Sequence, residues 1–240
     1  AVMKIAVDAG NSRIKWGVHD GVSWVQQGSV PTEDAAALAG VASGWPGNAP
    51  VVACSVAGST VESTIEKVIA ECHLRLLWVR SETSAYGVHN GYEQPERLGA
   101  DRWAALIGAR SKVRKACLVV CAGTATTVDW LDAAGNFRGG LILPGVTLML
   151  AALARNTAQL PHADGEFQAE PRNTMDAIVS GCLHAQAGAI ERMFRQSSAE
   201  ETIARCLVTG GAASQIVPHL RVPWRMEATL ILDGLLQYAS

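Results

Sequence analysis

The sequence predicts an α/β protein built from two similar lobes. Two observations predict this fold: expected strands alternate with expected helices, and one strand–turn–strand pattern occurs twice. The first copy runs from Ile5–Val7 into a small-residue turn at Asp8–Ser12, and the second runs from Leu118–Val120 into Cys121–Thr127. The two turns begin close to half of the 240-residue chain apart. We therefore expect one hairpin per lobe, with both turns facing a cleft suited to a nucleotide triphosphate.

Apolar runs and turn formers place the elements of the first lobe. In order, we expect strands at 2–7, 13–18 and 23–30, a helix start at 32–34, a buried parallel strand at 50–56, a helix at 59–72, a strand at 74–79 and a helix at 101–115. Residues 81–98 hold many turn formers and little periodicity, so we expect a long loop there. Long loops inside compact domains are usually functional or mobile.

The second lobe begins after the helix at 101–115. We expect a strand at 117–121, a hairpin that continues to Leu143, helices at 147–155 and 176–195, and a strand, glycine turn and helix start at 207–212. No low-complexity linker separates the halves. The predicted lobes are therefore residues 1–116 and 117–240.

Composition excludes several classes of function. The net charge is −2, the pI is near 6.3 and no run of basic residues occurs, which disfavours nucleic-acid binding. No apolar stretch of about 18 residues predicts a membrane span. The N-terminus resembles a strand rather than a signal peptide, and the six scattered cysteines are typical of buried thiols in a reducing compartment. We expect a cytoplasmic protein.

Asp8 is the first candidate for chemistry. It follows a strand that we expect to be buried, where an ionised carboxylate needs a cation, water or hydrogen-bond donors. It could anchor Mg²⁺ through water, or it could cap its own turn. The adjoining Gly10, Asn11 and Ser12, with Arg13 and Lys15, either place donors around phosphates or form an ordinary turn.

The second turn and a later glycine turn are weaker candidates. Gly123–Thr127 is rich in hydroxyls that could bind phosphate, although threonine is also common in strands. Thr209–Gly211 follows an apolar strand and suits either the close approach of a base or ribose, or a turn that requires a positive φ. Two hairpins at matching places in a duplicated unit indicate phosphate binding more strongly than either hairpin does alone.

A third group lies where the long loop meets the helix at 101–115. Asp101 could accept a proton from a substrate hydroxyl while Arg102 holds an anionic group, or Asp101 could cap the helix while Arg102 forms a surface ion pair. Tyr92 could add a phenol to the same ligand or simply pack. Thr174, at another expected helix start, could be a cap or a ligand donor.

Together these residues resemble the type III pantothenate kinases, in the superfamily of acetate and sugar kinases, Hsp70 and actin. The matching segments are Asp8–Ser12 with Trp16-Gly17, Tyr92, Gly99–Trp103, Gly123–Asp129, Gly139–Gly145, Asn173-Thr174 with Gly181, and Thr209–Gly211. They span the chain, and the Gly-Ala-Asp-Arg and Gly-Thr-Ala-Thr-Thr segments are specific in combination.

The resemblance implies two ribonuclease-H-like lobes of the actin-like ATPase type, a homodimer, and ATP-dependent phosphorylation of pantothenate, the first step toward coenzyme A. It implies Asp101 as the catalytic base and Asp8 as a support for Mg²⁺. The ATP contacts that it implies are Asp8, Ala9, Gly10, Asn11, Ser12, Arg13, Ile14, Lys15 and Thr124. The pantothenate contacts that it implies are Tyr92, Gly99, Ala100, Asp101, Arg102 and Thr174.

One position departs from the family. The resemblance implies a monovalent cation, K⁺ or NH₄⁺, held near an Asp where this chain has Cys121. A neutral thiol is a poor ligand for a hard cation, so this site is lost, moved or built from backbone carbonyls. Two other functions stay open: a sugar or other small-molecule kinase of the same superfamily, and a non-catalytic accessory regulator.

Overall fold

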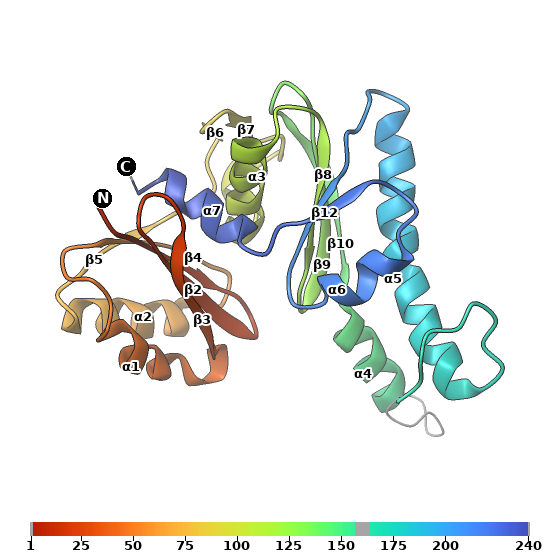
Figure 1. Ribbon diagram of the computed structural model, residues 1–240, viewed down its shortest axis with the longest axis horizontal. Coiled ribbons are helices and arrows are strands. Elements are labelled where there is room, and N and C mark those ends of the chain that lie inside the picture. Colours follow the sequence, from red (N-terminus) through yellow and green to blue (C-terminus); the bar gives the residue numbers. More distant parts are fainter. Residues whose placement is uncertain (1, 157–163, 240) are drawn as a thin grey trace. The chain divides into compact units, whose positions relative to one another are not determined.

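The computed structural model describes residues 2–156 and 164–239, which form two compact units (Figure 1). The first unit comprises Ala1–Val113 with Thr229–Ser240, and the second comprises Arg114–Ala228. These units differ from the lobes expected at 1–116 and 117–240 chiefly in the C-terminal segment. That segment packs with the first unit, because its helix lies against a helix of that unit.

The first unit contains a five-stranded sheet with the order β3-β2-β1-β4-β5. Strands β1, β2 and β3 form an antiparallel meander, whereas β4 and β5 run parallel to β1. The strands are β1 (Lys4–Ala9), β2 (Arg13–His19), β3 (Trp24–Pro31), β4 (Pro50–Ser55) and β5 (Arg75–Trp78). Strand β1 begins and ends two residues later than predicted, and each of the other four strands lies within one residue of its expected range at both ends.

Helices cover both faces of this sheet (Figure 1). The helical segments are η1 (Thr32–Ala37), α1 (Leu38–Ala42), α2 (Ser59–Glu71), η2 (Pro95–Arg97), α3 (Ala100–Lys112) and α7 (Leu230–Gln237). Ile5, Val7 and Ala9 of β1 belong to the core that includes α1 and α2. Because successive strand residues point to opposite faces, Asp8 lies on the other face, the one that α3 and α7 cover.

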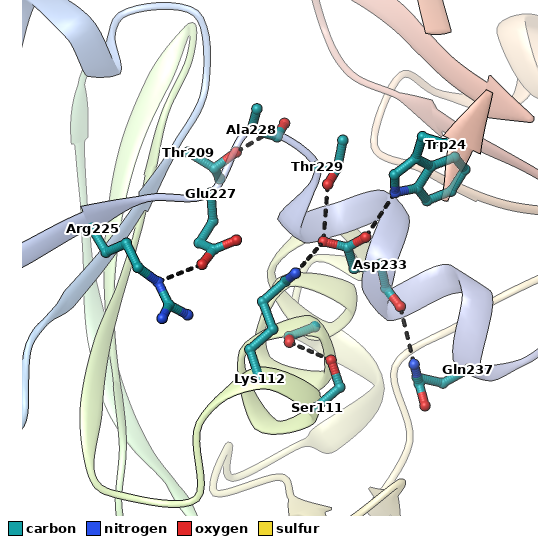
Figure 2. Close-up of polar contacts among 11 residues, drawn as sticks. Trp24, Ser111, Lys112, Thr209, Arg225, Glu227, Ala228, Thr229, Asp233 and Gln237 are labelled. Carbon is teal, nitrogen blue, oxygen red and sulfur yellow. Dashed lines mark hydrogen bonds and ion pairs between the residues drawn. The ribbon is translucent and has the colours of Figure 1, made fainter. Parts of the chain in front are cut away.

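Helices α3 and α7 are in backbone contact through two glycines. A Cβ at Gly108 would overlap the carbonyl oxygen of Leu230, and a Cβ at Gly234 would overlap that of Ala104. Asp233 adds polar contacts: its carboxylate accepts hydrogen bonds from Trp24 and Thr229, at 2.9 and 3.0 Å, and Lys112 Nζ lies 3.1 Å away (Figure 2). Helix α7 is therefore fixed against both the sheet and α3.

The second unit repeats the topology of the first. Its sheet has the order β10-β9-β8-β11-β12, again with an antiparallel meander followed by two strands parallel to the first. The strands are β8 (Cys117–Ala122), β9 (Ala125–Leu131), β10 (Phe137–Pro144), β11 (Cys206–Thr209) and β12 (Trp224–Met226). The internal duplication expected from the two turns is thus present in the fold.

The helices of the second unit cover one face of its sheet with a core that includes Leu118, Val120 and Ile190. They are α4 (Val146–Asn156), α5 (Thr174–Ser198), α6 (Ala213–Ile216) and η3 (Val217–His219). The expectations did not include β12, α7 or the small hairpin formed by β6 (Ser84–Ala85) and β7 (Val88–His89), which lies inside the long loop at 81–98. Within the described ranges, no helix is long and apolar enough to cross a membrane.

Candidate functional site

Asp8 lies next to the end of β1 as a nearly buried carboxylate, 7% exposed. It is paired in register with Lys15 of β2 and Cys54 of β4, and the Cys54 thiol donates a hydrogen bond to Asp8 Oδ1 at 3.6 Å. Burial, reinforced by the negative charge of Asp101, raises the pKa of Asp8 to about 7, against the opposing charge of Lys15 and the thiol hydrogen bond. The structure therefore brings the two predicted carboxylates into electrostatic contact.

The first turn joins β1 to β2 as a tight hairpin. The Gly10 amide donates to the carbonyl of Arg13 at 3.0 Å. Thr32, which follows β3, ties the turn down: its hydroxyl donates to the Gly10 carbonyl at 2.7 Å and its amide to the Ser12 carbonyl at 3.0 Å. Asn11 and Ser12 are exposed. The turn is therefore anchored by Thr32, while the side chains of Asn11 and Ser12 remain exposed.

The other predicted contacts of this hairpin divide into backbone and side-chain candidates. Ala9 and Ile14 are fully buried in the core, so only their backbone could meet a ligand. Lys15 is exposed, and its charge acts on Asp8. Arg13 is exposed but bonded to the neighbouring strand, with Nε donating to the Ser29 hydroxyl at 2.9 Å.

Asp101 lies in the first turn of α3. The N-cap position belongs to Gly99, so the alternative that Asp101 is the N-cap is wrong. Its Oδ1 nevertheless accepts the Arg102 amide at 2.8 Å, one of the amides that a helix start leaves without an intrahelical partner. Burial raises the pKa of Asp101, against the amide hydrogen bond and the charge of Arg102. A carboxyl group with a raised pKa is a better proton acceptor at neutral pH.

Arg102 and Tyr92 form a second polar pair beside Asp101. Arg102 is 4% exposed and donates from Nη1 to the Tyr92 hydroxyl at 2.8 Å, and its guanidinium lies 5.5 Å from the Tyr92 ring centroid. The alternative of a surface ion pair for Arg102 is therefore wrong. The structure brings Tyr92, Gly99, Ala100, Asp101 and Arg102 together at the start of α3, and their contact with a ligand stays a prediction.

In the second unit, the second turn joins β8 to β9 in the same way. The Gly123 amide donates to the Ala125 carbonyl at 3.0 Å, as the Gly10 amide does to Arg13. Thr124 is exposed at the tip, whereas Thr126 and Thr127 are buried and their hydroxyls have no hydrogen-bond partner among the described residues. Of the predicted hydroxyl cluster, only Thr124 is exposed, because Thr126 and Thr127 lie within β9, where both are buried.

Strand register makes Cys121 the counterpart of Asp8. Asp8 is the residue before the end of β1 and pairs with Lys15 and Cys54, and Cys121 is the residue before the end of β8 and pairs with Thr127 and Thr209. The match differs in one detail, because Thr209 is the last residue of β11. The second unit thus carries a thiol where the first carries a carboxylate.

The glycine turn after β11 has a structural reason. Gly210 has a φ of +104°, and a Cβ there would overlap the backbone of Ala122. The requirement for a positive φ is therefore confirmed, while a contact with a base or ribose stays a prediction.

Thr174 is the first residue of α5, and it is exposed. Asn173 is the N-cap: its Oδ1 accepts the Asp176 amide at 2.9 Å. The alternative of Thr174 as the cap is therefore wrong.

Two residues that were not selected from the sequence contact the candidate site in the first unit, Cys54 and Asn90, and a third, Tyr238, contacts its neighbours Trp103 and Glu82. Cys54 was expected to be a buried thiol, which it is, but strand pairing places it on Asp8. Asn90 accepts the Tyr92 amide at 3.0 Å. The apolar periodicity of residues 230–236 could have predicted α7, and with it a position for Tyr238.

The surroundings of Asp8 fit a divalent cation held through water. This carboxyl group has a thiol as its hydrogen-bond partner in the described part of the chain, and its pKa is raised chiefly by burial and then by the charge of Asp101. Mg²⁺ in phosphoryl-transfer sites takes one or two carboxylates and keeps several waters. Among the described residues, no group of three or more His, Cys, Asp or Glu side chains is placed to hold a metal ion.

The fold is shared with solved structures of low sequence identity. A candidate Baf family transcriptional activator from Campylobacter jejuni has a TM-score of 0.63 at 18% identity, covering 97% of this chain and 96% of that chain. A candidate 2-dehydro-3-deoxygalactonokinase from Sinorhizobium meliloti has 0.63 at 15%, covering 98% and 97%. MreB 5 of Spiroplasma citri bound to AMPPNP has 0.51 at 9%, covering 99% and 96%. These likenesses are of fold alone, and they confirm the predicted actin-like class.

Sequence similarity is more specific. Proteins named type III pantothenate kinase from Aromatoleum aromaticum and Dechloromonas aromatica are each 51% identical over 97% of this chain, which covers 96% and 97% of their own lengths. The profile of the type III pantothenate kinases matches residues 4–196, which include both hairpins and the start of α3. On these matches, the chain belongs to the type III pantothenate kinase family.

Proposed function

We propose that the chain is an ATP:pantothenate 4′-phosphotransferase, which transfers the γ-phosphoryl group of ATP to the primary hydroxyl of pantothenate in the first step of coenzyme A biosynthesis. The observation that carries the proposal is the start of α3. There a partly buried carboxyl group with a raised pKa, Asp101, adjoins the pair formed by buried Arg102 and half-buried Tyr92, in a chain of this family.

Asp101 is the group that we assign to the substrate hydroxyl. It orients the hydroxyl and accepts its proton as the phosphoryl group is transferred. Arg102, together with the first amides of α3, suits the carboxylate of pantothenate, since a helix N-terminus favours an anion. Gly99, Ala100 and Tyr92 complete the part of the pantothenate site that the first unit provides, and we assign Thr174 to the same ligand.

The first turn is assigned to ATP. Backbone amides from Asp8 to Lys15, the side chains of Asn11 and Ser12, and the charges of Arg13 and Lys15 suit phosphate oxygens. Thr124 of the second turn is assigned as a further ATP ligand. When bound beside Asp8, Mg²⁺ would offset the negative charge that builds up on the phosphates. Positioning and charge stabilisation then supply most of the rate, because phosphoryl transfer needs little covalent chemistry from the protein.

Phosphorylation assays with purified protein test this proposal. With ATP and Mg²⁺, we expect turnover of pantothenate and none of a hexose panel at equal concentration. Turnover of a hexose in preference to pantothenate would support the sugar-kinase alternative. Absence of any ATP-dependent product, with ATP binding retained, would support the accessory-regulator alternative.

The same assays address the monovalent cation. Because a thiol at Cys121 is a poor ligand for K⁺ or NH₄⁺, we propose that the chain either needs no such cation or holds it with backbone carbonyls. Comparison of rates in K⁺, NH₄⁺ and a bulky organic cation separates these cases. Equal rates in all three would indicate that the site is lost.

We also propose a cytoplasmic homodimer. Buried thiols at Cys54, Cys182 and Cys206 suit a reducing compartment. The second unit exposes Leu141 and Ile142 on the edge strand β10, with 40% and 65% of their surfaces accessible, and such apolar edges usually pair with another chain. Light scattering after size-exclusion chromatography would measure the mass, and a mass of 25.3 kDa, that of one chain, would contradict the dimer.

A further inference from the structure

The loop at 81–98 carries Tyr92 and is closed at its base. The hydroxyl of Ser81 donates to the carbonyl of Leu98 at 2.7 Å. Between these ends the β6–β7 hairpin gives the loop internal structure, although most of its side chains are exposed. The position of Tyr92 therefore depends on a few polar contacts rather than on a core of its own.

Asn90 organises the interior of this loop. Its Nδ2 donates to the carbonyls of Glu82 and Pro95 at 3.1 and 3.0 Å, and its Oδ1 accepts the amide of Tyr92 at 3.0 Å. One amide side chain thus joins the backbone of Glu82, near the beginning of the loop, to the backbone of Tyr92.

The C-terminal helix reaches the same loop through Tyr238. Its hydroxyl donates to Glu82 Oε1 at 2.7 Å and accepts a hydrogen bond from Trp103 Nε1 at 3.0 Å. The ring packs edge-on against Tyr86, with centroids 4.7 Å apart. Trp103 is fully buried in α3 and follows Arg102 directly.

These contacts close a ring. From Trp103 it passes through Tyr238, Glu82, Asn90 and Tyr92, whose hydroxyl accepts from Arg102 at 2.8 Å. We propose that Tyr238 is a positioning residue for the pantothenate site, holding the 81–98 loop on α3 so that the Tyr92–Arg102 pair is formed before substrate binds. This inference rests on the proposed function, since it assumes that Tyr92 and Arg102 contact pantothenate.

Tyr238 is itself held in a fixed place. Four to five residues before it, Asp233 is bound by Trp24, Thr229 and Lys112 (Figure 2), and Gly234 sits in backbone contact with α3. Burial and the hydrogen bond to Glu82 raise the pKa of Tyr238, so the phenol stays protonated and remains a donor. A rigid helix thus presents a permanent donor to a loop with few other anchors.

The test is the variant Tyr238→Phe, which keeps the ring against Tyr86 and removes the hydroxyl. We expect the KM for pantothenate to rise about 3- to 10-fold, the effect of losing one or two hydrogen bonds, with the KM for ATP and kcat nearly unchanged. Hydrogen exchange without substrate gives an independent readout: the amide of Tyr92 should exchange faster than in the wild-type chain.

Three further variants separate positioning from general stability. Glu82→Ala should reproduce the effect of Tyr238→Phe, and the double variant should be no worse than either single one, because both break the same link. Glu82→Gln keeps an acceptor and should stay near wild type. Tyr86→Phe is the matched control: it removes a phenol from the same loop whose hydroxyl makes no hydrogen bond among the described residues, so neither KM nor exchange should change.

Two outcomes would overturn the inference. One is an unchanged KM for pantothenate and unchanged Tyr92 exchange in a folded Tyr238→Phe protein. The other is a parallel loss of melting temperature and of affinity for both substrates, which would mark Tyr238 as a general stabiliser. A wild-type chain that does not phosphorylate pantothenate would instead refute the proposed function, and the exchange experiment would still test the ring.

Discussion

The two hairpins of the molecule are alike in backbone and different in chemistry. Both join the first two strands of a five-stranded sheet, and in both a glycine amide closes the turn. At equivalent register positions, however, the first hairpin has Asp8 flanked by Lys15 and Cys54, and the second has Cys121 flanked by Thr127 and Thr209. The fold specifies where a turn is presented, and the side chains decide what the turn can bind.

The two units also differ in what covers the sheet face that carries Asp8 or Cys121. In the first unit, the face that carries Asp8 is covered by α3 and α7, and α3 brings Asp101 near it. In the second unit, the core-forming helices pack with the opposite face, the one that carries Leu118 and Val120. Both carboxylates with raised pKa values therefore belong to the first unit. We infer that the first unit carries the proton chemistry and that the second contributes ligand contacts.

The largest effect is expected for Asp101→Asn, which tests whether the first unit carries the proton chemistry. The variant keeps the size of the side chain and an oxygen for the Arg102 amide, but it cannot accept the substrate proton, so kcat should fall about 10²- to 10⁴-fold. Circular dichroism and melting temperature should stay near those of the wild-type chain. Turnover within about twofold of wild type would remove Asp101 from the mechanism.

Variants at the equivalent positions Asp8 and Cys121 test whether the two hairpins differ in chemistry. Asp8→Asn removes the carboxylate assigned to Mg²⁺, and kcat/KM for ATP should fall about 10²-fold or more, with a higher Mg²⁺ concentration for half-maximal rate. Cys121→Ser changes only the polarity of the counterpart and should stay within about threefold. Similar losses in the two variants would show that the hairpins share the chemistry.

The pH dependence of the free energy of unfolding should also distinguish Asp8 from Cys121. Burial raises the pKa of Asp8 to about 7 in the folded chain, above its value of 3.8 when unperturbed. Between these values the unfolded state releases the proton that the folded state keeps, so Asp8 lowers stability progressively as pH rises from about 4 to 7.

Without Mg²⁺, Asp8→Asn should therefore be more stable than wild type at pH 8, by at most about 4 kcal/mol, and the gain should vanish toward pH 4. Urea unfolding of both proteins across this range measures the difference. Cys121→Ser serves as the control. A gain in Asp8→Asn that does not depend on pH would contradict the assignment of the raised pKa to Asp8.

Much of this arrangement follows from local patterns, and the rest depends on long-range packing. Strand positions and the duplication were predictable because apolar alternation and turn residues are local signals. The seating of α7 on α3 was not, because it rests on the two small residues Gly108 and Gly234, which carry no periodic signal. The site residues divide in the same way. Asp8 and Asp101 could be selected from their neighbours in sequence. Cys54 and Tyr238 could not, because Cys54 reaches Asp8 through the pairing of β4 with β1, and Tyr238 reaches Glu82 and Trp103 through the packing of α7 on α3.

The smallest expected effect is on stability, and it concerns the different ends of β4 in the first unit and β11 in the second. In the first unit β4 continues through Ser55, which pairs with Ala9, whereas in the second unit β11 ends at Thr209 and Gly210 turns over Ala122. Gly210→Ala meets both a positive φ and overlap with the Ala122 backbone, so it should destabilise the chain by about 2–3 kcal/mol. Gly211→Ala is the control, because a Cβ there has no neighbour within 4 Å. Melting curves in which both variants lose equal stability would mean that the backbone conformation at Gly210 is not what sets the second hairpin apart from the first.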